Sequence, residues 1–364
     1  MTREAILEAL RANVPFRGLP GISVGALEPG PSPLDVAFYL NWGGNRVSVL
    51  GVIKSACTPK LIQEIAPWLA GMKNMRKDAA YAVICPALSA QAQSACSESN
   101  IDFIDLAGNV SIQVPERFLL QRVGLKSKAF ARPALLRDPF SGKSSRVLRV
   151  LLERPREWTL KEIAQELAAE SRRNPASVWD FGLSMSSASK TVRSLEEELL
   201  VRRRNLKILT PEPSRLLRRW AEKYKERYRW YLRRSFRCPN PFGGQLQAVA
   251  SGLRQFLGGN GFAFTGAAAV ATAPFVDLDR IDVFVDPSSE ARLRSLEDQP
   301  GVAPELRVMR PYDIGVFMYP QMIGEMPLVS DIQAYLDLSA RGGRDSKQAE
   351  YLLRHVIEPR WGQT

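Results

Sequence analysis

Apolar and polar residues follow short-period patterns over the first 114 residues, and these patterns predict an α/β core. Residues 36–40 and 46–54 are expected strands, joined at 41–45 by a turn with two glycines and two asparagines. Around this hairpin the pattern predicts helices at residues 6–12, 61–75 and 88–97, and strands at 80–85, 101–105 and 110–114. Two strands followed by alternating helices and strands favour a mixed sheet with helices packed against it.

The middle of the chain has helical spacing followed by a basic hairpin. The expected helices cover residues 144–153, 161–168 and 184–200. Thr159 stands where the second helix needs its N-cap, and Glu162 completes a capping box. Residues 200–210 predict two short strands around an Arg-Asn turn, and residues 213–237 predict a long basic helix.

The last third predicts an α+β domain of ordinary size. Its expected helices are 245–257, 328–340 and 347–356, and its expected strands begin at 262 and cover 280–285, 305–309 and 313–318. The whole chain is therefore a multidomain protein of the α/β and α+β classes. We expect domains at residues 1–137, 138–237 and 238–364.

Cysteine and histidine usage excludes several kinds of site. The four cysteines lie far apart without paired spacing, and His355 is the single histidine. This composition argues against zinc ribbons, multi-histidine metal sites and His-based triads. No apolar run approaches the ~18 residues of a membrane span, and the start of the chain is unlike a signal peptide. We expect a reduced, cytoplasmic protein without cofactor, metal or membrane contact.

Charge is concentrated in the middle of the chain. The formal net charge is +12, and residues 141–240 alone contain 24 basic and 12 acidic side chains. The net charges of the two flanking segments are small and cancel each other, with +4 in residues 1–140 and −4 in residues 241–364. A basic segment between two nearly balanced domains is typical of a polyanion-binding surface. We expect double-stranded DNA as the partner.

The expected DNA contacts lie on one helix and one hairpin. Residues 184–200 place apolar residues on one face and small hydroxyls and long cations on the other, as a recognition helix requires. The hairpin adds four cations suited to backbone phosphates. The candidate DNA-binding residues are Ser186, Ser187, Lys190, Thr191, Arg193, Arg202, Arg203, Arg204 and Lys207. Three helices followed by a basic hairpin predict a winged helix-turn-helix.

The long helix that follows has an aromatic stripe. Trp220, Tyr224, Tyr228 and Tyr231 recur at helical spacing. We interpret the stripe as packing against the protein itself or a second copy, so a homodimer stays open. The opposite face would extend the phosphate track through Arg218, Arg219, Lys223, Lys225, Arg229, Arg233 and Arg234.

The order of elements in the first domain resembles the restriction-endonuclease-like fold. Nuclease members of that fold hold a metal with an Asp and an acid-x-Lys motif. Asp35 and Lys54 would supply the first acid and the lysine, but Val52 stands where the second acid is needed. Two hard oxygen ligands for magnesium cannot be assembled from this motif. We expect an inactive domain, with a DNA nuclease through Asp35 and Lys54 as an alternative.

A second enzymatic interpretation concerns the last domain. Gly266 and Ala267, followed by Asp277 and Asp279, imitate the Gly-Ser…Asp-x-Asp pattern of metal-dependent nucleotidyltransferases. The serine of that pattern is absent, and a loop with solvated aspartates explains these residues as well. We therefore predict no enzyme activity and no catalytic residue, with the nucleotidyltransferase kept as an alternative.

Several short stretches resemble the AbiEi-type antitoxins and regulators of type IV toxin–antitoxin systems. They are IDFIDLAGN at 101–109, TGAAA at 265–269, VFVD at 283–286, YDIGVF at 312–317 and DIQAYLDL at 331–338. They occur in order over most of the chain, together with the expected winged helix. The resemblance implies a DNA-binding transcriptional regulator and autorepressing antitoxin. It also implies a cognate nucleotidyltransferase-type toxin, countered without a stable complex during abortive infection.

Overall fold

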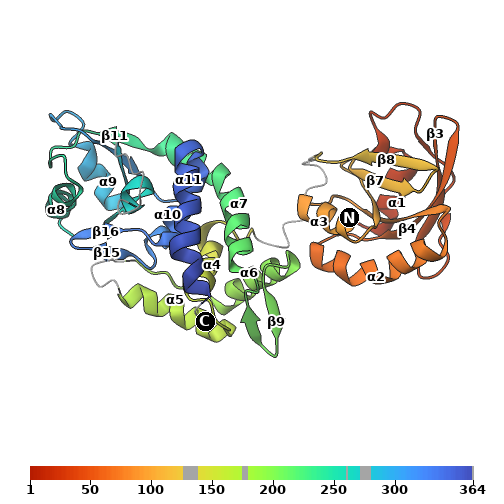
Figure 1. Ribbon diagram of the computed structural model, residues 1–364, viewed down its shortest axis with the longest axis horizontal. Coiled ribbons are helices and arrows are strands. Elements are labelled where there is room, and N and C mark those ends of the chain that lie inside the picture. The colour runs from red at the N-terminus through yellow and green to blue at the C-terminus, as the bar shows by residue number, and fades with distance from the viewer. Residues whose placement is uncertain (126–137, 174–178, 260, 271–279, 363–364) are drawn as a thin grey trace. The chain divides into compact units, whose positions relative to one another are not determined.

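The structure is a computed structural model that describes residues 1–125, 138–173, 179–259, 261–270 and 280–362 (Figure 1). The chain divides into two compact units. The N-terminal unit is Met1–Leu136 with Glu196–Leu199, and the C-terminal unit is Arg137–Leu195 with Leu200–Thr364. Both units mix helices with a β-sheet, so the protein is an α/β protein. None of the described helices is long and apolar enough to cross a membrane.

The N-terminal unit is a mixed sheet covered on both faces. Its strands are β1 (Ser23–Val24), β2 (Glu28–Pro29), β3 (Val36–Trp42), β4 (Asn45–Ile53), β5 (Ala79–Cys85), β6 (Asp102–Asp105), β7 (Val110–Val114) and β8 (Phe118–Arg122). They are ordered β1-β3-β4-β5-β6-β7-β8, with β2 also on β3. β4, β5 and β6 are parallel, and the neighbouring pairs on either side are antiparallel. The predicted order of helices and strands is present, and β1, β2 and β8 are additional strands.

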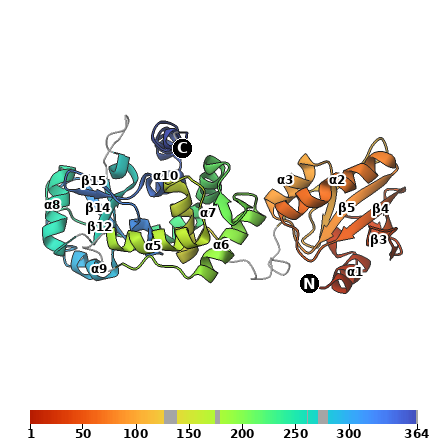
Figure 2. The same cartoon turned by 90° about the horizontal axis from the view of Figure 1, so that it is seen from below.

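Helices on both faces explain why β5 is apolar throughout. α1 (Arg3–Arg11) packs on one face, and α2 (Pro59–Met75) and α3 (Ala90–Glu98) pack on the other (Figure 2). Every residue of β5 is buried, because its side chains alternate between two hydrophobic cores. A strand buried on both faces has a continuous apolar sequence instead of an alternating one.

The IDFIDLAGN segment forms a buried turn after β6. Asp105 is fully buried, and its carboxylate accepts hydrogen bonds from the backbone N–H groups of Leu88 and Asn109 at 2.9 and 2.8 Å. The Asn109 amide also donates to Asp105, and it exchanges hydrogen bonds with the backbone of Leu125. Gly108 lies between them at φ +102°, a conformation that favours glycine. The structure gives this distinctive stretch a structural role, because it ties three segments of the unit together.

The C-terminal unit begins with helices and a hairpin. Its helices are α4 (Ser145–Glu153), α5 (Leu160–Arg173), α6 (Met185–Glu197), α7 (Pro213–Arg234), α8 (Leu246–Leu257), α9 (Pro287–Arg294), α10 (Asp331–Arg341), α11 (Gly343–Leu352) and α12 (Glu358–Trp361). The hairpin consists of β9 (Arg202–Arg204) and β10 (Lys207–Leu209). Single helical turns occur at Val14–Phe16 in the N-terminal unit, and at Gly142–Ser144, Gly266–Val270, Ile314–Phe317 and Leu353–Ile357 in this one.

The second sheet lies in the same unit. Its strands are β11 (Phe236–Cys238), β12 (Phe262–Thr265), β13 (Arg280–Val285), β14 (Glu305–Met309), β15 (Gln321–Ile323) and β16 (Met326–Leu328), in the order β11-β14-β13-β12-β16-β15. One hydrophobic core extends from Phe140 to Ile357 and includes residues of α4 to α7, α10 and the sheet. The segments predicted as domains 138–237 and 238–364 thus share one core.

One predicted strand in this unit is wrong. Residues 313–318 form a single helical turn at Ile314–Phe317, although their apolar pattern suggests a strand. Asp313 starts the turn because its carboxylate accepts the N–H of Gly315 at 2.8 Å. The same carboxylate pairs with Arg146 of α4 at 2.8 Å. Side-chain contacts from a distant helix therefore override the local β preference.

The aromatic stripe of α7 packs against the protein itself. Trp220, Tyr224, Tyr228 and Tyr231 are all at least 95% buried. The Tyr224 hydroxyl donates to Asp337 of α10 at 2.6 Å, and Thr265 of β12 donates to the other oxygen of Asp337. Burial raises the pKa of Asp337 to about 6, although these two hydrogen bonds lower it. A helix, a strand and a second helix thus meet at one buried carboxyl group.

We predict that Asp105→Ala destabilises the N-terminal unit by about 3 kcal/mol, because several buried N–H groups would be left without an acceptor. Urea denaturation of the full-length protein, followed by circular dichroism, measures the change. Asp78→Ala is the control, since Asp78 is exposed and pairs only with Arg76 among the described residues. Equal midpoints for both variants would contradict the structural role of Asp105.

A second prediction concerns pH. An aspartate in an unfolded chain has a pKa of about 3.9, whereas the folded Asp337 keeps its proton up to about pH 6. The unfolded state therefore loses this proton first, and Asp337 makes folding less favourable as the pH rises from about 4 to 6. Asp337→Asn should remove that effect, so its free energy of unfolding relative to the parent should increase across this window by up to ~3 kcal/mol. Urea unfolding at several pH values measures it.

Asp298→Asn is the control for this pH series, because it removes an exposed carboxylate. A parallel pH profile for Asp337→Asn and the parent protein would refute the assignment of a proton to Asp337 in the folded state.

Candidate nucleic-acid interface

Most of the predicted DNA-binding residues of α6 lie on its accessible side. Lys190 and Arg193 are exposed, and so is Ser186. Ser187 is half-buried, and its hydroxyl accepts a hydrogen bond from Ser184 at the start of the helix. The opposite face buries the apolar residues Ala188, Val192 and Leu195. The exposed half of α6 thus presents two long cations and a hydroxyl.

Thr191 is placed differently from the prediction. It is 1% exposed, and its hydroxyl donates to the carbonyl of Ser187 at 2.9 Å. The reason is geometric: around the helix Thr191 lies between the buried Ser194 and Leu195, so it turns toward the core. Thr191 therefore supports the helix from inside and is not part of its exposed face.

The β9–β10 hairpin has a two-residue turn at Asn205 and Leu206. Both residues have positive φ angles, +48° and +65°, which suit the tight turn of a two-residue hairpin. Arg202, Arg203 and Arg204 are exposed on β9, and Lys207 is half-buried on β10. The four predicted hairpin cations thus belong to one short ribbon.

Leu206 was not among the predicted DNA-binding residues. It is 86% exposed at the tip of the hairpin, between Asn205 and Lys207. Asn205 carries the sequence signal for the turn, since asparagine tolerates the left-handed conformation. An exposed leucine in a strained conformation is unusual, and neither periodicity nor charge points to it.

Contacts on both sides hold the hairpin in place. Arg203 donates to the carbonyl of Ser189 in α6 at 3.3 Å. On the other side, the backbone of Ile208 exchanges two hydrogen bonds with Trp158, which precedes α5. The chain before α5 therefore lies alongside β10 like a third strand. The hairpin and the exposed face of α6 are thereby fixed relative to each other.

The predicted capping box at the start of α5 is confirmed. Thr159 N–H donates to Glu162 at 2.6 Å, and Glu162 N–H donates to the Thr159 hydroxyl at 3.2 Å. The side chain and backbone of Thr159 hold the pKa of Glu162 at about 2. Lys207 approaches the same carboxylate at 4.0 Å. Glu162 remains ionised at neutral pH and offsets part of the hairpin charge.

The outer face of α7 is basic, but two of its cations are engaged within the protein. Arg218 pairs with Glu350 of α11 at 2.7 Å, and Arg219 pairs with Glu222 at 2.9 Å. The remaining predicted cations of this face are exposed: Lys223, Lys225, Arg229, Arg233 and Arg234.

The residues of the nuclease alternative make structural contacts. Asp35 accepts the N–H of Ile53 at 2.8 Å and pairs with Arg3 at 3.2 Å. Val52 is 2% exposed and faces the core. Among the described residues, no three His, Cys, Asp or Glu side chains are grouped closely enough to hold a metal ion. Asp35 thus caps a strand in this structure.

The nucleotidyltransferase alternative rests on Asp277 and Asp279, which lie outside the described residues. The nearby Asp282 of β13 is 2% exposed. It pairs with Arg280 at 3.3 Å, with Arg307 at 2.6 Å and with Arg341. Arginine guanidinium groups surround this carboxylate, whereas a metal site would need further acids.

No protein-family model matches the sequence, and no curated protein matches it. Among solved structures, the one described as "Structure of EndoMS in apo form" is similar to part of the chain, with 16% identity and a TM-score of 0.22. The similarity covers 29% of this chain and 46% of EndoMS, so the chain spans less than half of that protein. A similarity of this extent supports no functional conclusion.

Proposed function

We propose that α4, α5, α6 and the β9–β10 hairpin form a winged helix-turn-helix that binds double-stranded DNA. The observation that carries the proposal is the joint placement of two basic elements. Lys190 and Arg193 are exposed on α6, and Arg203 ties the basic hairpin to the same helix through Ser189. A helix beside a cationic ribbon suits a duplex, because one element can enter the major groove while the other follows the phosphates.

Each element has a separate role in this proposal. Lys190 and Arg193 reach base edges, together with Ser186 and Ser187, since long cations and small hydroxyls can donate to bases without steric conflict. Arg202, Arg203, Arg204 and Lys207 contact backbone phosphates. Thr191 is left out of the DNA-binding set because it is buried. The capping box at Thr159 and Glu162 fixes the start of the supporting helix α5.

We further propose that the protein is a transcriptional regulator and acts as an autorepressing antitoxin of the AbiEi type. The support is the resemblance of the short sequence stretches, such as IDFIDLAGN and DIQAYLDL, in their order along the chain. In this proposal the N-terminal unit is a restriction-endonuclease-like domain without catalytic activity. The order of its helices and strands and the structural contacts of Asp35 support that interpretation.

The regulatory role needs no metal and no nucleotide. It is tested by co-expression with the product of the adjacent gene, where a nucleotidyltransferase toxin is expected. Growth rescued by this protein supports the antitoxin role, and unrestrained toxicity rejects it.

We predict that Lys190→Ala and Arg193→Ala change sequence choice as well as affinity. The preferred duplex is first selected from a randomised pool with the parent protein. Each variant should then lose about 1–3 kcal/mol of discrimination between the selected duplex and a random one, the range of a single base contact. Fluorescence anisotropy titrations measure both affinities. Lys347→Ala, an exposed lysine of α11, is the charge-matched control. Equal weakening on all duplexes would place another element in the groove.

The hairpin cations should behave in the opposite way. Alanine at all four, Arg202, Arg203, Arg204 and Lys207, should weaken selected and random duplexes by similar factors. The slope of log affinity against log salt should flatten by about 0.9 for each phosphate that is no longer neutralised. Titrations at several salt concentrations measure the slope. Their matched control replaces Lys223, Lys225, Arg229 and Arg233 of α7, four exposed cations outside the hairpin.

Two outcomes would reject the hairpin as a wing. One is an unchanged slope in the hairpin variant. The other is a larger effect of the α7 control, which would move the phosphate track to that helix.

A further inference from the structure

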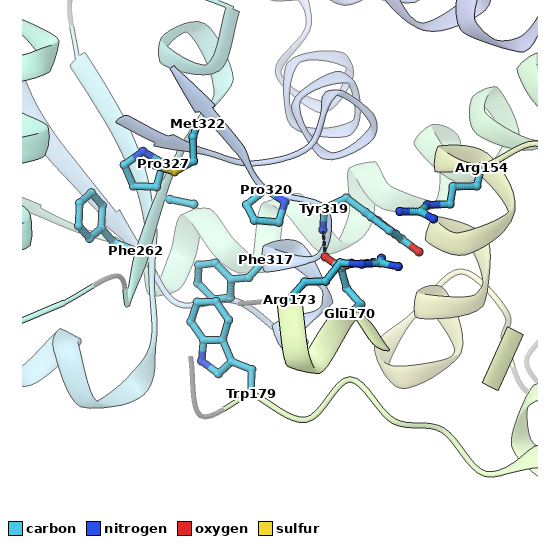
Figure 3. Close-up of a pocket in the computed structure, with 11 residues that line it drawn as sticks. Arg154, Glu170, Arg173, Trp179, Phe262, Phe317, Tyr319, Pro320, Met322 and Pro327 are labelled. Atoms are coloured by element: carbon cyan, nitrogen blue, oxygen red, sulfur yellow. Dashed lines mark hydrogen bonds and ion pairs between the residues drawn. The ribbon is translucent and has the colours of Figure 1, made fainter. Parts of the chain in front are cut away.

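A cavity of about 560 Å³ lies between α5 and the second sheet, within the C-terminal unit. Apolar side chains line most of it: Trp179, Phe262, Phe317, Pro320, Met322 and Pro327. Figure 3 shows these side chains on one side of the cavity and Arg154, Glu170 and Arg173 on the other. A volume of this size, largely apolar with a few polar groups at one end, is typical of small-molecule sites.

The aromatic wall is held in place from behind. The rings of Trp179 and Phe317 are stacked, with centroids 3.9 Å apart and an interplanar angle of 16°. The chain next to Trp179 is anchored at two points. Arg146 donates to the carbonyl of Asp180 at 3.0 Å, and Phe181 N–H donates to Ser171 of α5 at 2.9 Å. The flat surface of the cavity is therefore formed before any ligand arrives.

The polar end is also fixed. Glu170 is 3% exposed, accepts the N–H of Tyr319 at 2.8 Å and pairs with Arg173 at 2.8 Å. Tyr319 has a φ of +53°, which a tyrosine rarely adopts, and such conformations concentrate at functional sites. The hydrogen bond from its N–H to Glu170 helps to hold it there. The Tyr319 hydroxyl reaches Glu166 at 3.3 Å.

At the mouth of the cavity, Arg154 is the cation whose guanidinium group is best placed to bind a ligand. Its side chain is 47% exposed, and its Nε lies 3.5 Å from Glu166. Arg173 approaches Glu166 more closely, at 2.7 Å. Within the described residues no hydrogen bond engages the two terminal nitrogens of Arg154, so they can donate to a ligand oxygen.

We propose that this cavity binds a planar aromatic carboxylate of two or three fused or linked rings. Its ring system lies against Trp179 and Phe317, and its carboxylate accepts hydrogen bonds from Arg154. An aromatic ligand can pack on the Trp179–Phe317 pair in an offset-stacked or edge-to-face arrangement. A guanidinium prefers a carboxylate, which it can bind through two parallel hydrogen bonds.

The position of the cavity couples such a ligand to α6. Glu170 and Arg173 belong to α5, Arg154 follows α4, and Trp179 belongs to the chain between α5 and α6. The other walls belong to the sheet, to the turn at Phe317 and to the two residues before β15. A ligand that joins these walls restrains α5 and thereby α6. We therefore assign the site to an effector that changes DNA affinity, and this part alone rests on the proposed function.

Isothermal titration calorimetry of the full-length protein with 2-naphthoate tests the site without DNA. A dissociation constant on the order of 0.1–1 mM is expected for a ligand of this size. Met322→Trp should weaken binding by about tenfold or more, because the indole enters the cavity. Ile323→Trp is the matched control: it is the next residue of β15, is 40% exposed, and does not line the cavity. It should bind like the parent protein.

The carboxylate is tested in the same series. Arg154→Ala should weaken 2-naphthoate by about tenfold, the range of one charge-assisted hydrogen bond, and leave methyl 2-naphthoate nearly unchanged. No heat of binding for 2-naphthoate at millimolar concentration would overturn the site. So would equal effects of Met322→Trp and Ile323→Trp. Equal affinity of the acid and its methyl ester for the parent would overturn the carboxylate assignment.

A DNA titration with and without saturating 2-naphthoate then tests the effector role. A severalfold change in duplex affinity, abolished in Met322→Trp and kept in Ile323→Trp, supports it. Naphthoate binding with unchanged duplex affinity overturns the effector role and leaves the site intact. Absence of any duplex binding rejects the proposed function instead, while the calorimetry still decides the site.

Discussion

Burial of the aromatic face of α7 is the constraint on which the C-terminal unit depends. This helix is so basic that it would be solvated without Trp220 and the three tyrosines of its stripe. Four buried aromatic side chains supply a gross hydrophobic free energy on the order of 10–20 kcal/mol. Their polar atoms need partners in the core, and Asp337 of α10 accepts from Tyr224 while Arg341 donates to Tyr228. Specific hydrogen bonds therefore define where α7 packs.

The same interactions extend to the helices around the basic surface. The Trp220 indole donates to the carbonyl of Phe140 just before α4, and Arg149 of α4 donates to Gln333 of α10. The three helices and the second sheet thus share one core. We propose that a ligand in the cavity between α5 and the sheet acts on α6 through this shared core. Helices joined to the sheet only by a flexible linker would lack such a path.

Net charge alone overstates the proposed DNA-facing surface of this protein. Arg146 and Arg149 count among the 24 cations of residues 141–240, yet they are only 2% and 3% exposed. Arg146 pairs with Asp313 inside the unit, and Arg218 and Arg219 of α7 pair with nearby glutamates. The candidate interface is therefore confined to α6 and the hairpin, and the remaining outer cations of α7 are the alternative phosphate track. An inward arginine and an outward arginine look the same in a charge count.

Local interactions could be predicted from the sequence alone. The capping box of Thr159 and Glu162, the tight turn at Asn205 and the succession of helices and strands along the N-terminal unit all depend on residues close together in the chain. Even the unpredicted helix α9 has such a signal, because Asp286 caps it and Pro287 opens it. The sequence also determined where positive charge accumulates and which face of α6 is apolar.

Only the tertiary structure decided the features that need distant partners. Arg149 meets Gln333 across 184 residues of sequence, and Arg146 meets Asp313 across 167. Because of these interactions Arg146 and Arg149 point into the core. Residues 313–318 form a helical turn where their pattern predicts a strand. The cavity beside Trp179 likewise unites α5 with strands far along the chain. Periodicity reports which face of an element is apolar, but it carries no information about which distant side chain will cover that face.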